Sequence, residues 1–271
     1  MSLTIVCLSW LCLAQADGAS ALEERTWSVA GLDRTGLVHV PRSAKTQPTP
    51  VVFAFHGHGG SAQGAARMFR FHESWPEAMV VYLQGVPTPG RLTDPEGKRN
   101  GWQHSAGDHD DRDLKLFDTV LAALRAEYKI DDRRLYSTGH SNGGGFTYLL
   151  WVHRGDVLAA VAPSAAAARA LPTAKPKPAM IIGSENDPLV LWKWQQACID
   201  FVLKLNQCDS TGEPWGDGCT LYASKTGTPL VTFIHENGHK FAADALPNIV
   251  KFFKEQALPE SAASATTRSE R

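Results

Sequence analysis

The chain has 271 residues, 43% of them hydrophobic, and its 27 basic and 28 acidic residues leave a net charge of −1. This length suits one large domain or two small ones, and the apolar content is sufficient for a sizeable core. Charges of both signs are mixed along the chain without a basic stripe, so we expect no nucleic acid partner.

The N-terminal residues have the pattern of an export signal. Residues 4–13 form an apolar run that is too short to span a membrane. Ala14-Gln15-Ala16 follows it and matches a small-x-small cleavage site. We therefore predict a signal peptide over residues 1–16 and a secreted or periplasmic protein. No Lys or Arg precedes the run, so a mistranslated or frayed N-terminus stays the alternative.

The remaining chain predicts one folded domain over residues 24–257 and a disordered tail over residues 258–271. The tail contains Ser, Ala, Thr, Glu and Arg without an apolar face. No segment after the signal reaches membrane-spanning length, so no membrane partner is expected after signal removal.

Short apolar runs predict the strands of a sheet, and longer periodic segments predict helices. Residues 26–30 and 35–40 predict a hairpin around a turn at 31–34. Strands are also expected at residues 51–55, 78–83, 134–138, 157–163, 179–182 and 230–234. Helices are expected at residues 61–71, with Ser61 as the cap, 113–129, 146–153, 191–206 and 242–255.

This alternation implies an α/β fold with a mostly parallel central sheet and helices on both faces. Ligands of such sheets bind at the carboxyl ends of the strands. Four polar clusters directly follow predicted strands, at residues 56–60, 139–143, 183–187 and 235–239. We expect these clusters to meet at one edge of the sheet.

The segment Gly139-His140-Ser141-Asn142-Gly143 lies between a predicted strand and a predicted helix. The G-x-S-x-G pattern in this context is typical of a nucleophile elbow, in which a tight turn lifts the serine hydroxyl above the sheet. The backbone at such a turn is strained, and its neighbours two residues away need to be nearly free of side chains. A glycine-rich turn that contains a serine by chance is the competing interpretation.

A serine hydroxyl needs a base, and the base needs a carboxylate that orients it. In α/β-hydrolases these groups occur in the order Ser, acid, His, which Ser141, Asp187 and His239 satisfy. Glu185 is the alternative acid, and His235 is the alternative base. An Asx turn before proline is the alternative interpretation of Asp187 itself.

The negative oxygen of a tetrahedral intermediate needs preorganised donors. We expect the backbone N–H of Asn142 to be one donor and that of His58 to be the other. A plain strand-to-helix turn at residues 56–60 is the alternative, as is a metal site that includes His56 and His58.

We predict no metal and no cofactor. Four histidines lie near acidic residues in loops, but their spacing matches neither zinc nor calcium motifs. These residues are His56, His58, His104 and His109, with Asp108, Asp110, Asp111 and Asp113. Asp113 is predicted to be the N-cap of its helix.

Three cysteines lie outside the predicted signal. Cys208 and Cys219 flank a loop rich in Gly, Asp, Pro and Ser, and an exported protein can form a disulfide between them. Cys198 lies in a helical segment and is predicted to be a buried thiol. The pairing itself does not follow from the sequence.

Several of these segments resemble the secreted polyhydroxybutyrate depolymerase and feruloyl esterase group, an α/β-hydrolase family that also includes acetylxylan esterases. They are the GHSNGGG elbow, the HGHGG loop at residues 56–60, and residues 128–136 with the pattern Y-x-I-D-x-x-R. The likeness extends over residues 51–253. It implies an α/β-hydrolase fold and hydrolysis of an ester through an acyl-enzyme.

Two turns differ from the family pattern. The acid turn at residues 183–190 is one residue longer, and Phe241 replaces the usual Trp after the catalytic histidine, with no following Pro. Aromatic residues at such places usually line the substrate pocket in this family. We therefore expect Phe241 to contact substrate, together with Trp102 from the long loop at residues 84–113. An anchor for that loop is the alternative role of Trp102.

The leading hypothesis is a secreted serine esterase that acts on a small or oligomeric feruloyl, acetyl or hydroxybutyrate ester. A non-catalytic binding protein on the same scaffold would lack members of the triad. A serine peptidase would keep the triad, and a separate propeller or lid domain would favour it. The sequence does not indicate the oligomeric state.

Overall fold

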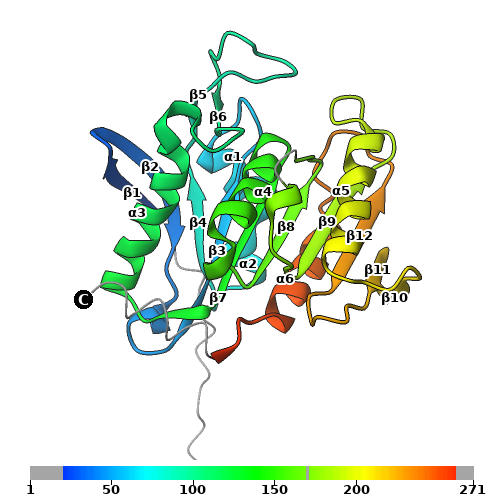
Figure 1. The fold of residues 1–271 in the computed structure, drawn as a ribbon. Helices are drawn as coiled ribbons and strands as arrows, with labels where there is room; N and C mark the ends of the chain where they lie inside the picture. The colour runs from blue at the N-terminus through cyan, green and yellow to red at the C-terminus, as the bar shows by residue number, and fades with distance from the viewer. Residues whose placement is uncertain (1–20, 169–170, 261–271) are drawn as a thin grey trace, which may run out of the picture.

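The computed structural model describes residues 21–168 and 171–260. The predicted signal peptide therefore lies outside the described residues, and so does most of the predicted tail. One ten-stranded sheet crosses the molecule, in the order β1-β2-β4-β3-β7-β8-β9-β12-β11-β10 (Figure 1). Its strands are β1 Glu23–Val29, β2 Leu32–His39, β3 Thr49–Phe55, β4 Met79–Leu83, β7 Ile130–His140, β8 Ala160–Ser164, β9 Ala179–Ser184, β10 Glu213–Gly216, β11 Cys219–Tyr222 and β12 Leu230–His235.

Helices cover the sheet and connect its parallel strands. They are α1 Ala62–Phe69, α2 Phe71–Ser74, α3 Arg112–Glu127, α4 Asn142–Arg154, α5 Trp192–Leu205 and α6 Ala245–Glu255, with short 3-10 turns η1 Arg42–Lys45, η2 Asp108–Asp111, η3 Gly155–Val157 and η4 Leu171–Thr173. Ser61 caps α1 as predicted, because its Oγ accepts a hydrogen bond from the N–H of Gly64 at 3.1 Å.

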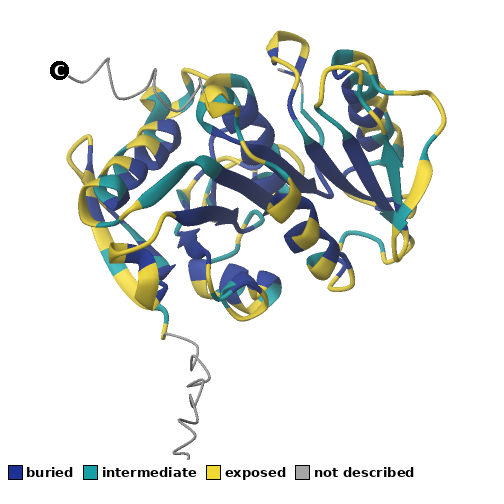
Figure 2. Cartoon of the chain, turned by 90° about the horizontal axis from the view of Figure 1, so that it is seen from below, coloured by how far each residue is buried: buried dark blue, intermediate teal, exposed yellow. Residues whose placement is uncertain are grey.

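The six central strands, from β4 to β12, pair in parallel, and the outer strands pair antiparallel. The predicted mostly parallel sheet is thus confirmed. Strand β3 is buried along its whole length, since alternate side chains enter different cores on the two faces. Figure 2 shows the strands in the middle of the sheet in dark blue, the colour of buried residues. Val51, Phe53 and Phe55 pack with α3, α4 and α5, whereas Val52 and Ala54 pack with α1 and α6.

The first hairpin turns one residue earlier than predicted. Its two turn residues are Ala30 and Gly31, which have positive φ values of 50° and 82°, as a two-residue hairpin loop with the right twist requires. Asp33 and Arg34, which the sequence placed in the turn, belong to β2 and pair with β1.

The predicted loop at residues 84–113 is not structureless. It contains a small two-stranded sheet, β5 Val86–Pro87 and β6 Asn100–Gly101, and the turn η2. Helix α3 begins at Arg112, so the prediction that Asp113 is its N-cap is wrong. Asp113 is fully buried and forms an ion pair with Arg34 at 2.9 Å.

The disulfide between Cys208 and Cys219, which the sequence left open, does not form, because Cys198, Cys208 and Cys219 are free thiols among the described residues. Cys219 begins β11 and is buried in the core under α6, whereas Cys208 packs against the core on the other face of the sheet. Residues between them form the hairpin β10–β11, which the sequence did not reveal.

The first residues of the predicted tail contact the folded domain. The N–H of Leu258 donates to the carbonyl of Arg133 at 2.8 Å, and its side chain packs against the second core. The rest of the predicted tail, from residue 261, lies outside the described residues. Within residues 21–168 and 171–260, no helix combines the length and the apolar character that a membrane span needs.

Candidate active site

Ser141 occupies a sharp turn between β7 and α4. Its φ of 57° and ψ of −120° lie in a region that residues with side chains rarely adopt. A Cβ on Gly139 would lie 2.3 Å from the carbonyl oxygen of Gly143, and a Cβ on Gly143 would lie 2.2 Å from that of Phe55. Both positions therefore require glycine, and the turn has the form of a nucleophile elbow.

Three side chains from different loops form one chain of contacts. Ser141 Oγ lies 2.8 Å from His239 Nε2, and His239 Nδ1 lies 2.8 Å from Asp187 Oδ2. Asp187 follows β9 and His239 follows β12, so the parallel sheet brings residues 98 positions apart to one edge. The arrangement can transfer the hydroxyl proton to His239 and stabilise the imidazolium.

The carboxylate of Asp187 is held from several directions. Its Oδ1 accepts hydrogen bonds from the N–H groups of Leu189 at 2.8 Å and Val190 at 2.9 Å. Gln195 donates to its Oδ2 at 3.2 Å and is itself buried. These bonds fix the carboxylate in the orientation that meets His239.

Gln195 is a functional candidate that the sequence reasoning missed. It lies on α5 together with the buried residues Cys198, Ile199 and Val202, at positions i, i+3, i+4 and i+7. A polar residue on this apolar stripe was the available signal, since a buried amide needs hydrogen-bond partners. The three partners are Asp187, the carbonyl of Val190 and the N–H of Ser184.

His58 and Asn142 carry the two backbone N–H groups predicted to bind an oxyanion. Both residues line the same cavity as Ser141. In the part of the chain that the structure describes, neither N–H donates to another protein group. Asn142 also begins helix α4, whose N-terminal dipole favours negative charge. These features are consistent with the predicted role of the two amides as oxyanion donors.

His235 and Glu185, the alternatives for the base and the acid, lie at other positions. The Nδ1 of His235 accepts from the N–H of Asn237 at 3.1 Å, and Glu185 is exposed. The Nδ1 of His140 lies 3.3 Å from Ser164 Oγ. Burial lowers the pKa of His140 to about 4, and the nearby His239 ring adds to the shift.

The histidines of the HGHGG loop have protein partners. His56 Nδ1 donates to the carbonyl of Gly57 at 2.7 Å, while its Nε2 accepts from the N–H of Gly85 at 2.9 Å. This fixes a neutral tautomer, and burial lowers the pKa of His56. His58 Nε2 lies 3.0 Å from Asp94. Among residues 21–168 and 171–260, no three His, Cys, Asp or Glu side chains form a group that fits a metal ion.

The triad opens into a cavity of about 1070 Å³ with two different walls. One wall is apolar and comes from α4, α5 and the loops before them. Its larger side chains are Leu149, Leu171, Leu189, Val190, Trp194 and Phe201. The other wall comes from the loop at residues 84–113 and carries Arg91, Arg99 and His104.

The two residues predicted to bind substrate do not line this cavity. Trp102 is fully buried, and its ring packs against Phe55 and Phe146. The prediction that it contacts substrate is wrong, and the alternative role as an anchor describes its position. Phe241 is half-buried and packs edge-on against Phe69 and His140. It therefore supports the histidine turn from behind the cavity and does not form a wall of it.

Comparisons with known proteins agree with the predicted resemblance. No protein-family model matches the chain. "Probable feruloyl esterase C" of Aspergillus flavus is 27% identical over 130 residues, 48% of this chain and 45% of that protein. "Feruloyl esterase D" of Neurospora crassa is 27% identical over 143 residues, 51% of this chain and 47% of that protein. The chain thus spans about half the length of the curated relatives that it matches.

Solved structures establish the fold. The acetyl xylan esterase from Aspergillus awamori superposes with a TM-score of 0.62 at 12% identity, over 86% of this chain and 99% of that one. A thermostable esterase superposes with a TM-score of 0.60 at 16% identity, over 88% of this chain and 63% of that one. The chain has the α/β-hydrolase fold, as predicted, and is similar in sequence to feruloyl esterases.

Proposed function

We propose that this chain is a serine esterase that hydrolyses carboxylic esters through an acyl-enzyme. The observation that carries the proposal is the contact chain Ser141–His239–Asp187, with 2.8 Å at each step. The backbone N–H groups of His58 and Asn142, in the same cavity lining, donate to no other group among the described residues. The names of the relatives support the same activity.

The reaction has two halves. As Ser141 Oγ bonds to the ester carbonyl carbon, His239 Nε2 takes the hydroxyl proton, and the carbonyl oxygen becomes an oxyanion between the amides of His58 and Asn142. The carbon–oxygen bond to the alcohol then breaks, and His239 returns the proton to the departing alcohol. In the second half, His239 deprotonates a water that attacks the acyl carbon, so that the acid leaves and Ser141 regains its proton.

The apolar wall supports an aromatic acyl group such as feruloyl. Leu149, Trp194 and Phe201 provide the kind of surface on which a ring is desolvated. The relatives named feruloyl esterases point to the same acyl group. Acetyl and hydroxybutyrate esters are smaller substrates that the same triad would cleave.

Export belongs to the proposal as well. The apolar run at residues 4–13 and the small residues after it support cleavage after Ala16. Mass spectrometry of the N-terminus after expression with export tests this, since retention of residues 1–16 would contradict it.

Two other functions compete with the esterase. A non-catalytic binder would not need a complete triad with this geometry, and it would show no turnover. A serine peptidase uses the same triad but must also cleave amides. The ratio of ester to amide hydrolysis separates the peptidase from the esterase.

The test compares the hydrolysis of methyl ferulate with that of 4-nitrophenyl butyrate and of the matching ferulic acid amide, with Ser141→Ala as the blank. We expect both esters to be cleaved, the amide to remain intact and the variant to match the background. Turnover that persists in Ser141→Ala would contradict the proposal, and efficient amide cleavage would favour the peptidase.

A further inference from the structure

Trp102 connects the two segments that carry the oxyanion donors. Its indole Nε1–H donates to the carbonyl of His56 at 2.9 Å, two residues before His58. Its ring is enclosed by Phe55, edge-on at 5.1 Å, and by Phe146, stacked at 5.4 Å. The indole therefore fixes one end of the HGHGG loop from inside the core.

The backbone of the same residue holds the other donor. The N–H of Trp102 donates to Asn142 Oδ1 at 2.7 Å, and Asn142 Nδ2 donates to the carbonyl of Trp102 at 3.1 Å. These two hydrogen bonds run in opposite directions and form a clasp that holds the Asn142 side chain. One residue therefore contacts both segments that carry the predicted oxyanion donors.

Gly101 allows this close approach. A Cβ at Gly101 would lie 2.7 Å from His58 Nδ1 and 2.9 Å from Asn142 Oδ1, which is closer than real Cβ contacts allow. The segment before Trp102 consequently fits between the two donor residues without a side chain.

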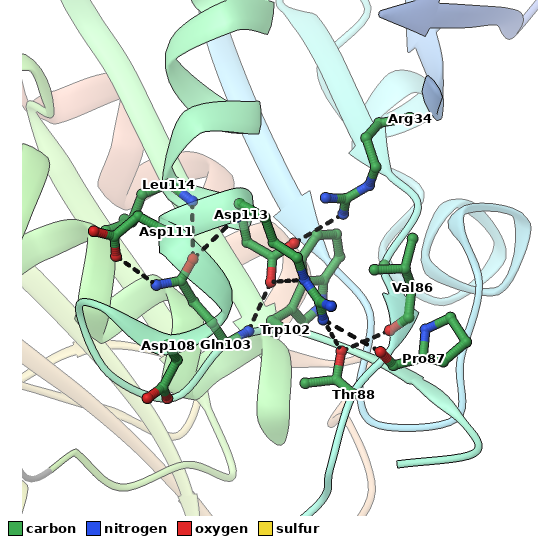
Figure 3. A network of polar contacts seen from close by, with 12 residues as sticks. Arg34, Val86, Pro87, Thr88, Trp102, Gln103, Asp108, Asp111, Asp113 and Leu114 are labelled. Atoms are coloured by element: carbon green, nitrogen blue, oxygen red, sulfur yellow. Dashed lines mark hydrogen bonds and ion pairs between the residues drawn. The ribbon is translucent and has the colours of Figure 1, made fainter. Parts of the chain in front are cut away.

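A buried polar network holds the chain on the other side of Trp102 (Figure 3). The N–H of Gln103 donates to Asp113 Oδ2 at 2.8 Å, and Gln103 Oε1 accepts from the N–H of Asp113 at 3.0 Å. Arg34 of β2 donates to the other carboxylate oxygen of Asp113 at 2.9 Å. These hydrogen bonds therefore hold the main chain next to Trp102 against β2 of the sheet and against the start of α3.

We propose that Trp102 is a positioning residue that sets the spacing between the N–H groups of His58 and Asn142. This inference rests on the proposed ester hydrolysis. The donors act on charge that develops in the transition state, and a small displacement weakens them without changing the binding of the neutral ester. Loss of the indole hydrogen bond to His56, or of the two hydrogen bonds to the Asn142 side chain, should accordingly lower kcat and leave KM almost unchanged.

The decisive variant is Trp102→Phe, which keeps a buried ring but removes the N–H donor to His56. We expect kcat for methyl ferulate to fall about tenfold, less than the roughly 100-fold effect of losing an oxyanion donor completely. KM should change by less than about twofold. Inhibition by a trifluoromethyl ketone, which forms an alkoxide on Ser141, should weaken by about the same factor as kcat.

Trp151→Phe is the matched control. Trp151 is equally buried, and its Nε1 donates to the carbonyl of Lys175 at 2.8 Å, on the other end of α4. The control loses the same kind of hydrogen bond, so it should lower the melting temperature to a similar degree. Its kcat and its affinity for the ketone should equal those of the wild type.

A second variant covers the case in which Trp102→Phe does not fold. Asn142→Ala removes the clasp from the cavity side and leaves the backbone N–H of residue 142 in place. It should show the same fall in kcat and ketone affinity. If both variants fold and keep the wild-type kcat and ketone affinity while the wild type is active, the positioning role is overturned. If the wild type itself lacks Ser141-dependent esterase activity, the proposed function fails instead.

Discussion

Gln195 donates a hydrogen bond to the same carboxylate oxygen of Asp187 that contacts His239, at 3.2 Å and 2.8 Å respectively. The bond comes from the first turn of α5, so the helix that forms part of the apolar wall also orients the carboxylate that we propose as the acid of the triad. Helix α5 therefore connects the cavity beside Ser141 with the proposed proton-transfer chain.

Replacing this amide should affect catalysis through Asp187. Gln195→Glu places a second carboxylate against Asp187, and the added negative charge should raise the pKa of His239 as a base. We expect the acid limb of the kcat/KM profile to move to higher pH. Gln196→Glu is the control, because Gln196 is the half-buried neighbour whose amide donates to Asp200 and not to Asp187. Superimposable profiles for both variants and the wild type would contradict the role of Gln195.

The elbow glycines should tolerate no side chain. Gly143→Ala places a Cβ 2.2 Å from the carbonyl oxygen of Phe55, a backbone atom that cannot rotate away. Its free energy of unfolding should fall by about 3 kcal/mol or more. Gly145→Ala is the matched change two residues later, where no described atom outside the adjacent residues and the backbone of α4 lies within 4 Å of the new Cβ. It should gain about 0.5–1 kcal/mol from its position inside α4. Chemical denaturation of both variants checks the difference, and equal losses would contradict the steric account.

Acid should destabilise the fold through His140. Its pKa is about 4 in the folded state, below the ordinary value of 6.5, so the unfolded chain binds more protons between these values. Above pH 6.5 the ring is neutral in both states, so the free energy of unfolding does not depend on it. As the pH falls from 6.5 towards 4, the free energy of unfolding decreases by about 3 kcal/mol. His140→Gln should remove this loss. A difference in unfolding free energy between variant and wild type that stays flat from pH 7 to pH 4 would rule out this assignment.

The apolar wall should determine the preference for an aromatic acyl group. Trp194 lines the cavity and is 41% exposed, so Trp194→Ala should raise KM for methyl ferulate about 5- to 30-fold, which corresponds to about 1–2 kcal/mol of lost contact. The KM for a 4-nitrophenyl acetate substrate should change little. Trp215→Ala, in the hairpin β10–β11, is the distant control. Equal effects on both esters would mean that the acyl group does not contact Trp194.

The sequence predicted the triad because each member follows a strand, and parallel strands deliver their carboxyl ends to one edge. Ser141, Asp187 and His239 needed only that topology. Trp102 and Asp113 were misassigned because their surroundings depend on how the loop at residues 84–113 folds over the sheet. That packing joins Asp113 to Arg34 across 79 positions, and no local pattern encodes it.

The hairpin β10–β11 was missed for a different reason. Its strands have four residues each and include Pro214 and Gly216, which are turn residues by composition. Cys208 and Cys219 then looked like the ends of one loop, although the structure places them on opposite faces of the sheet.

The central claim is that His239 activates Ser141 as the nucleophile, and covalent labelling tests it most directly. The protein is incubated with a fluorophosphonate, and the modified peptide is identified by mass spectrometry. We predict one phosphonyl group on Ser141, none on the Ser141→Ala variant, and labelling slowed by at least about 100-fold in His239→Ala. Labelling of another residue, or equal rates in wild type and His239→Ala, would contradict the account.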